Sequence, residues 1–287
     1  MAKVEKIVDI GAKLGEGPTW DEKTGTLYWV DIIGKKIIRT NVDNFSSEET
    51  SVSGQVGMMC LTEDGKIVCA LETGIHILEN GSERLLWENP ENTADIKNRF
   101  NDGKCDPKGR LFVGTISKNP SGALYRFDKD GPVKMISNVS TSNGLDWSPD
   151  LKYMYFIDTP SGKLRRFEYD VETGNIHNPI DFIDYTCDNG MFDGMTLDAD
   201  GCLWIAHWNG YKISKWDPIS GKKLEEIEIP TMNVTSCAFG GADMKTLYIT
   251  TATDSFDKSK PASPGSGALY AYQTDVKGRY ANRMKMI

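Results

Sequence analysis

The segment Phe192-Asp193-Gly194-Met195-Thr196-Leu197-Asp198-Ala199-Asp200-Gly201-Cys202-Leu203-Trp204-Ile205 contains a turn rich in aspartate and glycine, followed by an apolar stretch. A turn of this composition ahead of an apolar stretch is typical of a β-strand that follows a tight turn. The polar residue Asp193 stands four positions before Leu197, the last residue ahead of the turn. Because the same arrangement recurs along the chain, this segment decides the fold.

The apolar strand of this segment has five counterparts, each preceded by a turn rich in Asp, Gly, Pro or Lys. The six strands are Leu27–Asp31, Ile67–Leu71, Leu111–Thr115, Met154–Asp158, Leu203–His207 and Leu247–Thr251. Their starting positions are 40 to 49 residues apart. Repetition at this period is the mark of an array of similar structural units rather than of one irregular domain.

Each copy holds further strand patterns around this one. A first strand precedes it, another follows a glycine-marked connection, and a weaker one, such as Glu83–Trp87, comes last. Four strands in each of six copies predict an all-β fold, a six-bladed β-propeller with four antiparallel strands per blade, as a single domain over residues 1–287. A β-sandwich is the alternative. Residues 3–10 and 283–287 are both strand-like, so we expect the two termini to complete one blade together.

Composition and charge limit the possible partners. The net charge of −8 and the isoelectric point of about 5.1 argue against nucleic acid as a partner. No run approaches the ~20 apolar residues of a membrane span, and the N-terminus lacks a signal-peptide pattern. The 6 cysteines form no Cys-x-x-Cys pair. Buried free thiols in a reducing cytosol are favoured over three disulfides. We expect a cytoplasmic protein, a monomer or a weak dimer, that binds a small molecule and no membrane.

Three longer connections span residues 88–100, 184–191 and 253–266. In an up-and-down blade, the innermost strand begins on the face where the second strand ends. We therefore expect these connections to surround the entrance of the central channel, although surface loops without a role are an equal alternative. Whether they act as a lid is left open.

The innermost strands share a register position that gathers polar residues. It lies four residues before the last residue ahead of each turn, and it is occupied by Glu16, Gly57, Asn101, Asn143, Asp193 and Thr235. Because innermost strands converge on the axis of a propeller, these residues should lie near one another. Converging carboxylates without a countercharge are costly to bury. We therefore predict a divalent cation held by Glu16, Asn143 and Asp193, with Ca²⁺, Mg²⁺ or Mn²⁺ suited to such oxygen ligands.

Residues of these types also have roles that need no metal ion. An Asx-turn at Asn143-Gly144 needs no metal, and for any single residue of the set such a local structural role is favoured. Arg99 and Asp102 flank Asn101, and Arg99 could donate hydrogen bonds to substrate or be a solvated loop arginine. A lone histidine at the end of a strand, His207, is more often a packing residue than a ligand. The sequence contains no Gly-x-Ser-x-Gly motif, which argues against a serine hydrolase.

Several motifs together resemble the regucalcin (senescence marker protein)/gluconolactonase/luciferin-regenerating enzyme family. They are Gly15-Glu16-Gly17-Pro18, Asn98-Arg99-Phe100-Asn101-Asp102-Gly103-Lys104, Ser142-Asn143-Gly144-Leu145, Asp193-Gly194-Met195 and Val234-Thr235-Ser236-Cys237-Ala238-Phe239-Gly240-Gly241. The resemblance covers nearly the whole chain. It implies a six-bladed propeller that binds one divalent metal ion, for which Ca²⁺, Mg²⁺, Mn²⁺, Zn²⁺ and Fe²⁺ are the candidates.

The resemblance also implies roles for individual residues. The metal ligands of the family fall on Glu16, Asn143 and Asp193, and Asp193 is the expected general base in the hydrolysis of a sugar lactone. The substrate-binding residues of the family fall on Arg99 and Asn101, and we expect Asp102 to act with them. The chain departs from the animal members in the short connection at residues 116–122, where Asn119 replaces an acidic residue. That departure leaves the identity of the sugar open.

Three hypotheses of function follow. The first is metal-dependent hydrolysis of a sugar lactone, of the gluconolactone or pentonolactone type, to the aldonic acid. The second is a related hydrolase acting on phosphotriesters or other lactones, which would need a more apolar pocket. The third is a non-catalytic, Ca²⁺-binding regulatory propeller, which predicts metal binding without turnover.

Overall fold

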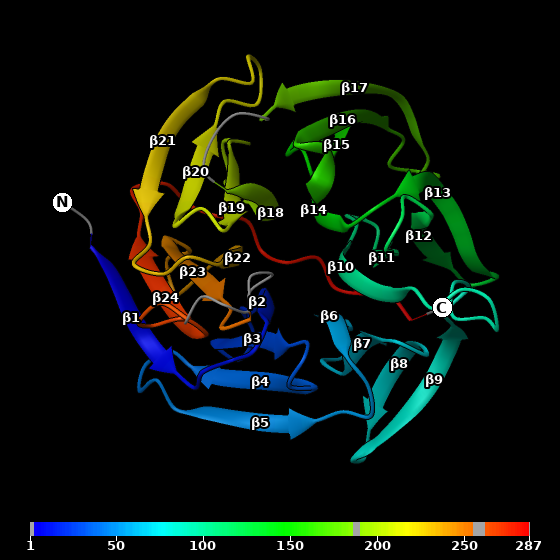
Figure 1. The fold of residues 1–287 in the computed structure, drawn as a ribbon, viewed down its shortest axis with the longest axis horizontal. Coiled ribbons are helices and arrows are strands. Elements are labelled where there is room, and N and C mark those ends of the chain that lie inside the picture. Colours follow the sequence, from blue (N-terminus) through cyan, green and yellow to red (C-terminus); the bar gives the residue numbers. More distant parts are fainter. Residues whose placement is uncertain (1–2, 186–189, 255–261, 287) are drawn as a thin grey trace.

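Six four-stranded antiparallel sheets stand around a central axis like the blades of a propeller (Figure 1). The computed structural model describes residues 3–185, 190–254 and 262–286. The predicted six-bladed propeller with four antiparallel strands per blade is confirmed, and the β-sandwich is excluded. The connections 184–191 and 253–266 lie partly outside the described residues, so their expected place around the entrance stays a prediction.

The blades follow one another in chain order, and each is given from its innermost to its outermost strand. Blades one and two contain β2 (Gly15–Asp21), β3 (Thr26–Asp31), β4 (Lys36–Asn41) and β5 (Ser47–Ser51), then β6 (Val56–Leu61), β7 (Ile67–Leu71), β8 (Gly74–Glu79) and β9 (Ser82–Glu88). Blade three contains β10 (Arg99–Cys105), β11 (Leu111–Ile116), β12 (Gly122–Asp128) and β13 (Gly131–Val139).

The remaining blades keep this order, with one change in the last of them. Blade four contains β14 (Ser142–Trp147), β15 (Tyr153–Asp158), β16 (Lys163–Tyr169) and β17 (Ile176–Asp184), with a short 3-10 helix η1 (Thr159–Ser161) after β15. Blade five contains β18 (Met191–Leu197), β19 (Leu203–Trp208), β20 (Lys212–Trp216) and β21 (Lys223–Glu228). Blade six contains β22 (Val234–Gly240), β23 (Thr246–Thr251), β24 (Ala268–Gln273) and β1 (Val4–Asp9).

Burial falls from the axis outwards, and this gradient explains why the strand signals differ in strength. Every residue of β3 and of β19 is buried, because each sheet is covered on both faces by the neighbouring blades. The outermost strands β5 and β21 are mostly exposed and carry glutamates. Charged residues on an edge strand oppose pairing with other chains. The large buried rings, among them Trp29, Phe112 and Trp204, therefore lie between blades rather than at the rim.

The ring is closed by the N-terminus alone, which corrects one prediction. Strand β1 pairs with β24, with Val4 opposite Tyr272, and supplies the outermost strand of blade six. Residues 283–287 were expected to share this blade, but the described part of that segment forms no blade strand. Met284 instead makes an isolated parallel bridge with Thr62 of blade two. A residue pattern of alternating polarity cannot distinguish a strand from an extended segment that packs elsewhere.

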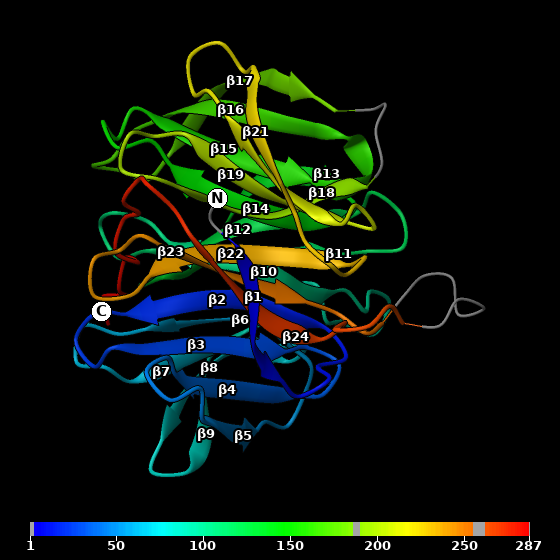
Figure 2. The same ribbon diagram turned by 90° about the vertical axis from the view of Figure 1, so that its left-hand side faces the viewer.

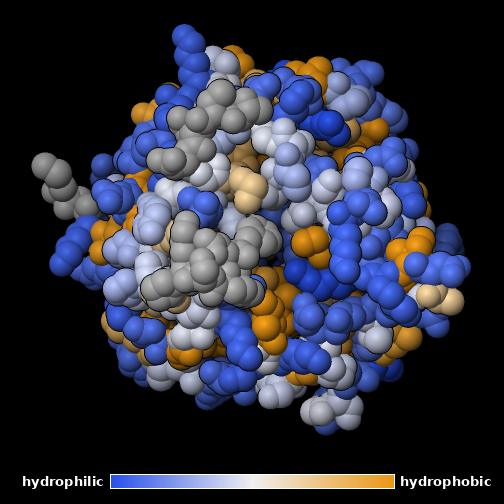
Figure 3. Space-filling model, in the orientation of Figure 1, coloured by the Kyte–Doolittle hydropathy of each residue, from blue (hydrophilic) through white to orange (hydrophobic). Residues whose placement is uncertain are grey.

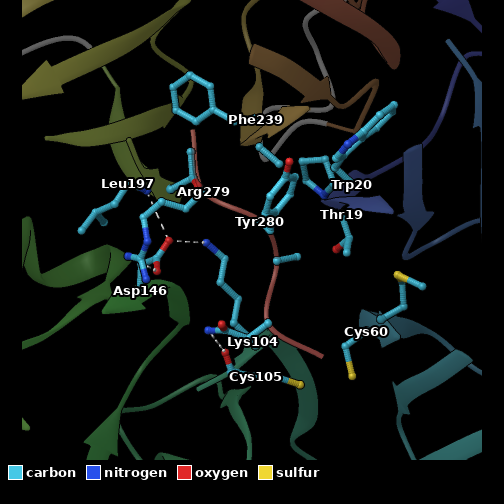
Figure 4. Close-up of a pocket in the computed structure, with 17 residues that line it drawn as sticks. Thr19, Trp20, Cys60, Lys104, Cys105, Asp146, Leu197, Phe239, Arg279 and Tyr280 are labelled. Atoms are coloured by element: carbon cyan, nitrogen blue, oxygen red, sulfur yellow. Dashed lines mark hydrogen bonds and ion pairs between the residues drawn. The ribbon is translucent and has the colours of Figure 1, made fainter. Parts of the chain in front are cut away.

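The C-terminal segment, residues 275–286, crosses the face of the propeller opposite the starts of the innermost strands (Figure 2). It bonds to every blade through Asp21, Leu61, Cys105, Trp147, Asp198 and Met244. Beneath it lies a cavity of about 70 Å³, where Lys104 Nζ donates to Asp146 Oδ2 at 3.1 Å and to Met195 O at 2.6 Å (Figure 4). Side chains and this segment thus cover the channel at its far end.

All six innermost strands contain a bulge at, or one residue before, the shared register position. The pairing with the second strand shifts after Glu16, Val56, Phe100, Ser142, Phe192 and Val234. In each case the innermost strand has one residue more than its partner. A bulge bends the strand and changes the direction of its side chains. The shared polar position identified in the sequence therefore lies in, or next to, a bulge in every blade.

Two further features bear on the sequence predictions. Among the described cysteines, Cys60, Cys69, Cys105 and Cys237 are free and buried, and Cys202 is free and half-buried. Cys187 lies outside the described residues. A search of the described part of the chain found no helix with the length and apolar character needed to cross a membrane.

Candidate metal centre

A cavity of about 380 Å³ lies where the innermost strands begin, and it opens on the face that Figure 1 shows to the viewer. It is lined by Glu16, Arg99, Asn101, Asn143 and Asp193, which brings together five of the six residues predicted for the site. In the space-filling view, hydrophilic and hydrophobic residues meet in a hollow near the centre of this face (Figure 3). The sixth predicted residue, Asp102, is buried but does not line the cavity.

Close packing of innermost strands brings Asn143 and Asp193 together. Each is followed by a glycine, and a Cβ atom at Gly144 would lie 2.8 Å from Asp193 O. A Cβ atom at Gly194 would lie 2.2 Å from Ser236 Oγ. Any larger residue would push the neighbouring blade away, so glycine is needed here for the approach of backbones rather than for an unusual dihedral angle.

A chain of hydrogen bonds orients the amide side chains of the cavity. Arg99 Nη1 donates to Asn101 Oδ1 at 2.8 Å, and Asn101 Nδ2 donates to Asn143 Oδ1 at 2.9 Å. Asn143 Nδ2 in turn donates to Thr159 Oγ1 at 2.7 Å. These bonds turn the oxygen of Asn143 toward blade three and its nitrogen toward η1. The amide oxygen keeps a second lone pair that can bind a cation.

The carboxylates of the cavity are buried without an adequate countercharge. Burial, and then the charge of Asp102, raise the pKa of Glu16 to about 8. Burial, followed by the charges of Glu16 and Asp102, raises the pKa of Asp193 well above its usual range. The charge of Arg99 lowers the pKa of Glu16 by less than burial raises it, and burial lowers the pKa of Arg99 itself to about 10. Together these shifts show that the cavity as it stands disfavours two ionised carboxylates.

This donor set fits a divalent cation. Glu16, Asn143 and Asp193 offer only oxygen atoms, and an added positive charge would allow both carboxylates to ionise. Within the described ranges, no group of three His, Cys, Asp or Glu side chains is arranged to hold a metal ion. The candidate site contains two such side chains, Glu16 and Asp193, and its third ligand is the amide of Asn143. Two other residues at the shared register position have structural roles. Thr235 Oγ1 donates to Gly15 O at 2.6 Å, and Gly57 packs against the backbone of blade three.

Several lining residues were missed by the sequence analysis. Gln55, Thr159 and Trp208 line the cavity together with the apolar residues Leu14, Ile32, Ile33, Ile116 and Met191. Most of them come directly after a second strand or before an innermost one, so the topology of a blade could have indicated them. The chain order alone could not show which side chains point inward. His207 has the packing role that was favoured: it is buried, and its Nε2 lies 2.7 Å from Ser214 Oγ.

Comparison with known proteins identifies the family. Residues 14–253 match the profile described as the SMP-30/Gluconolactonase/LRE-like region. A protein of Bacillus subtilis named "Putative sugar lactone lactonase YvrE" is 37% identical over 278 residues, and 94% of each chain is covered. The solved structure of a luciferin-regenerating enzyme has a TM-score of 0.93 and 32% identity, and covers 100% of both chains.

A second solved structure, of a calcium-binding protein named regucalcin from Agrobacterium tumefaciens, has a TM-score of 0.93 and 27% identity. The superposition covers 99% of this chain and 98% of that one. The profile match spans most of the chain, and the related sequences extend over nearly all of it. This protein therefore belongs to the SMP-30/gluconolactonase/LRE-like family, as its motifs predicted.

Proposed function

We propose that the protein hydrolyses a sugar lactone, of the gluconolactone or pentonolactone type, to the corresponding aldonic acid. The observation that carries the proposal is the meeting of two buried carboxylates, Glu16 and Asp193, with Asn143 in one cavity of about 380 Å³. A cavity of that volume is of the size that holds a small molecule. The name of the Bacillus subtilis relative, a sugar lactone lactonase, supports the same substrate class.

Glu16, Asn143 and Asp193 would hold one divalent cation. When bound, such an ion supplies a Lewis acid that polarises the lactone carbonyl and lowers the pKa of a water molecule. Ca²⁺, Mg²⁺ and Mn²⁺ match the oxygen donors, and Zn²⁺ or Fe²⁺ are the further candidates. The name of the Agrobacterium relative, a calcium-binding protein, favours testing Ca²⁺ first.

The side chains of the cavity would have separate roles in the hydrolysis. Asp193 accepts the proton of the attacking water, a new C–O bond forms at the carbonyl carbon, and the ring C–O bond breaks. Asp193 then returns this proton to the released ring oxygen, which becomes a hydroxyl group. Arg99 and Asn101 bind the hydroxyl groups of the sugar and so hold the carbonyl near Asp193. Asp102, which does not line the cavity, would act through the effect of its charge on Asp193 rather than by contact with substrate.

The test is acid release from a panel of sugar lactones. We expect the native protein to release acid, chelation to abolish the release, and added divalent ions to restore it. The variant Asp193→Ala should lose at least about a hundredfold in kcat, because general-base catalysis contributes that much. Asp200→Ala, at an aspartate in the turn after β18, is the matched control. Full activity of a folded Asp193→Ala protein would reject the mechanism.

Two other functions have some support. The named calcium-binding relative favours a non-catalytic, Ca²⁺-binding propeller, which predicts Ca²⁺ binding with no turnover of any lactone. The apolar side of the cavity, formed by Leu14, Ile32 and Ile33, favours a hydrolase of phosphotriesters or of other lactones. Faster turnover of an alkyl lactone or a phosphotriester than of every sugar lactone would select that second alternative.

A further inference from the structure

A second cavity, of about 500 Å³, lies beside the candidate metal centre and shares Arg99 and Ile116 with it as a common wall. Its other walls are two connections of blade three. One is residues 95–98, ahead of β10, and the other is residues 117–121, between β11 and β12. The roles proposed for Glu16, Asn143 and Asp193 make no use of this second cavity.

The second cavity is locally basic in an acidic protein. Lys97, Arg99 and Lys118 line it together with one carboxylate, Asp95, whereas the whole chain carries a net charge of −8. Lys97 Nζ donates to the neutral Asn92 Oδ1 at 3.2 Å. In the part of the chain that the structure describes, neither Lys97 nor Lys118 has a carboxylate partner within ion-pair distance. Two exposed ammonium groups are thus available to an anion.

Arg99 connects the two cavities. Its hydrogen bonds to Phe100 O and to Asn101 Oδ1 both leave from Nη1, at 2.9 and 2.8 Å. Among the described residues no acceptor is bonded to its Nε or Nη2, so these donors can bind a ligand. Arg99 therefore borders both cavities, and its free donors can bind a molecule that extends from the first cavity to the second.

Both basic walls are held in place by hydrogen bonds that are buried or partly buried. Glu91, which is buried, accepts from Asn98 Nδ2 at 3.0 Å, from Thr115 Oγ1 at 2.6 Å and from Tyr125 OH at 2.8 Å. It therefore ties the connection that carries Lys97 to strands β11 and β12. On the other side, Ser117 Oγ donates to Val139 O at 3.2 Å and accepts from Gly122 N at 3.1 Å, which fixes the turn of Lys118.

We propose that the second cavity is a subsite for an anionic substituent of the lactone, a phosphate or a carboxylate group remote from the reacting carbonyl. The inference rests on the proposed lactonase function, because it extends that substrate beyond Arg99. The lactone ring lies against Asn101 and Asp193, Arg99 bonds to the middle of the molecule, and Lys97 and Lys118 bind the anion. Asn119, in the same wall, is neutral and does not oppose it.

The first test measures binding and needs no turnover. Calorimetry in the presence of Ca²⁺ compares gluconate, 6-phosphogluconate and glucarate as probes. We expect 6-phosphogluconate to bind tighter than gluconate. The double variant Lys97→Gln/Lys118→Gln should lose about tenfold in affinity for 6-phosphogluconate and less than about twofold for gluconate, as expected for two exposed ion pairs. Glucarate carries a second carboxylate where 6-phosphogluconate carries its phosphate, so its affinity shows whether the second cavity binds a carboxylate as well.

Lys129→Gln is the matched control, because it removes one exposed charge from the β12–β13 turn of the same blade. A general effect of net charge would appear in this variant as well. Raised salt should weaken 6-phosphogluconate binding to the native protein and leave the double variant nearly unchanged. Equal affinity for gluconate and 6-phosphogluconate, or an unchanged affinity in the double variant, would overturn the subsite.

The second test measures kcat/KM for gluconolactone and for its 6-phosphorylated form. We expect a preference for the phosphorylated lactone that the double variant loses through KM, with kcat retained. Hydrolysis of gluconolactone without such a preference would refute the subsite and leave the proposed function standing. Selective binding of 6-phosphogluconate without turnover of either lactone would support the subsite and refute the lactonase.

Discussion

At the scale of single residues, the main feature of the candidate site is the burial of two carboxyl groups close to each other. Glu16 and Asp193 are buried in one cavity, and the pKa of each is raised by burial and by nearby carboxylates. The hydrogen bonds of Asn143 are satisfied on one side by Asn101 and on the other by Thr159. The position of the amide oxygen is therefore set by partners that need not touch a cation themselves.

Thr159→Val should weaken Ca²⁺ binding about tenfold, the usual cost of removing a partner that orients a metal ligand. The change removes the acceptor of the 2.7 Å bond from Asn143 Nδ2 and keeps the side-chain volume. Titration calorimetry of metal-stripped protein measures the effect. Thr246→Val, at a half-buried threonine that begins β23 in blade six, should bind Ca²⁺ like the native protein. Native affinity in the Thr159 variant would exclude Asn143 as an oriented ligand.

At the scale of the element, each second strand has to be buried on both faces, and this restricts its polar residues. His207 on β19 is fully buried, with Phe192 and Tyr185 packed edge-on against its ring at centroid distances of 5.3 and 5.0 Å. Its Nε2 is bonded to Ser214, and its Nδ1 has no partner among the described residues. Burial lowers the pKa of His207 to about 3.

The stability of the protein should consequently fall when the pH drops below the ordinary histidine pKa of 6.5. There the unfolded chain binds a proton that folded His207 cannot accept until the pH nears 3. Between pH 6.5 and 5 the loss from this group is about 1.5 kcal/mol. Urea unfolding of the native protein and of His207→Gln measures it, with the variant showing the shallower dependence. His177→Gln, at an exposed histidine, is the control for the loss of a histidine. Parallel curves for the native protein and the His207 variant would contradict the prediction.

At the scale of the whole molecule, the two ends of the channel differ in structure. The end with the starts of the innermost strands holds the cavity of the candidate metal centre. The other end is covered by residues 275–286, which bond to all six blades and place Arg279 and Tyr280 over the smaller cavity (Figure 4). A ligand of the candidate centre should therefore enter from the first end.

Arg283→Gln should lower the free energy of unfolding by about 2 kcal/mol, since it removes the cationic partner of the buried Asp21 carboxylate. Arg283 Nη2 lies 2.5 Å from Asp21 Oδ1 and 3.0 Å from Glu22 Oε2, so it links the C-terminal segment to blade one. Denaturant unfolding provides the measurement. Lys285→Gln, whose exposed ammonium is 4.0 Å from Glu63, should change stability by less than about 0.5 kcal/mol. Equal effects of the two changes would show that the segment does not clamp the ring.

Much of this architecture could be predicted from the residues alone, because a propeller is built from local units. Each copy contains its own turn, its apolar second strand and its polar register position, so the repeat revealed six blades and the shared position of Glu16, Asn143 and Asp193. Burial on both faces makes the second strands uniformly apolar and therefore easy to recognise. The outermost strands are half solvated, which is why their signals are weak.

Features that depend on contacts between distant segments could not be predicted in the same way. The C-terminal segment is extended and alternates in polarity like a strand, and only packing shows that it crosses the channel instead of joining blade six. The bulges that redirect the polar residues, and the meeting of Arg99 with Lys97 and Lys118 around a second cavity, also appear only in three dimensions. Local sequence determined the units and their register, whereas ring closure and cavity shape were decided by tertiary packing between blades.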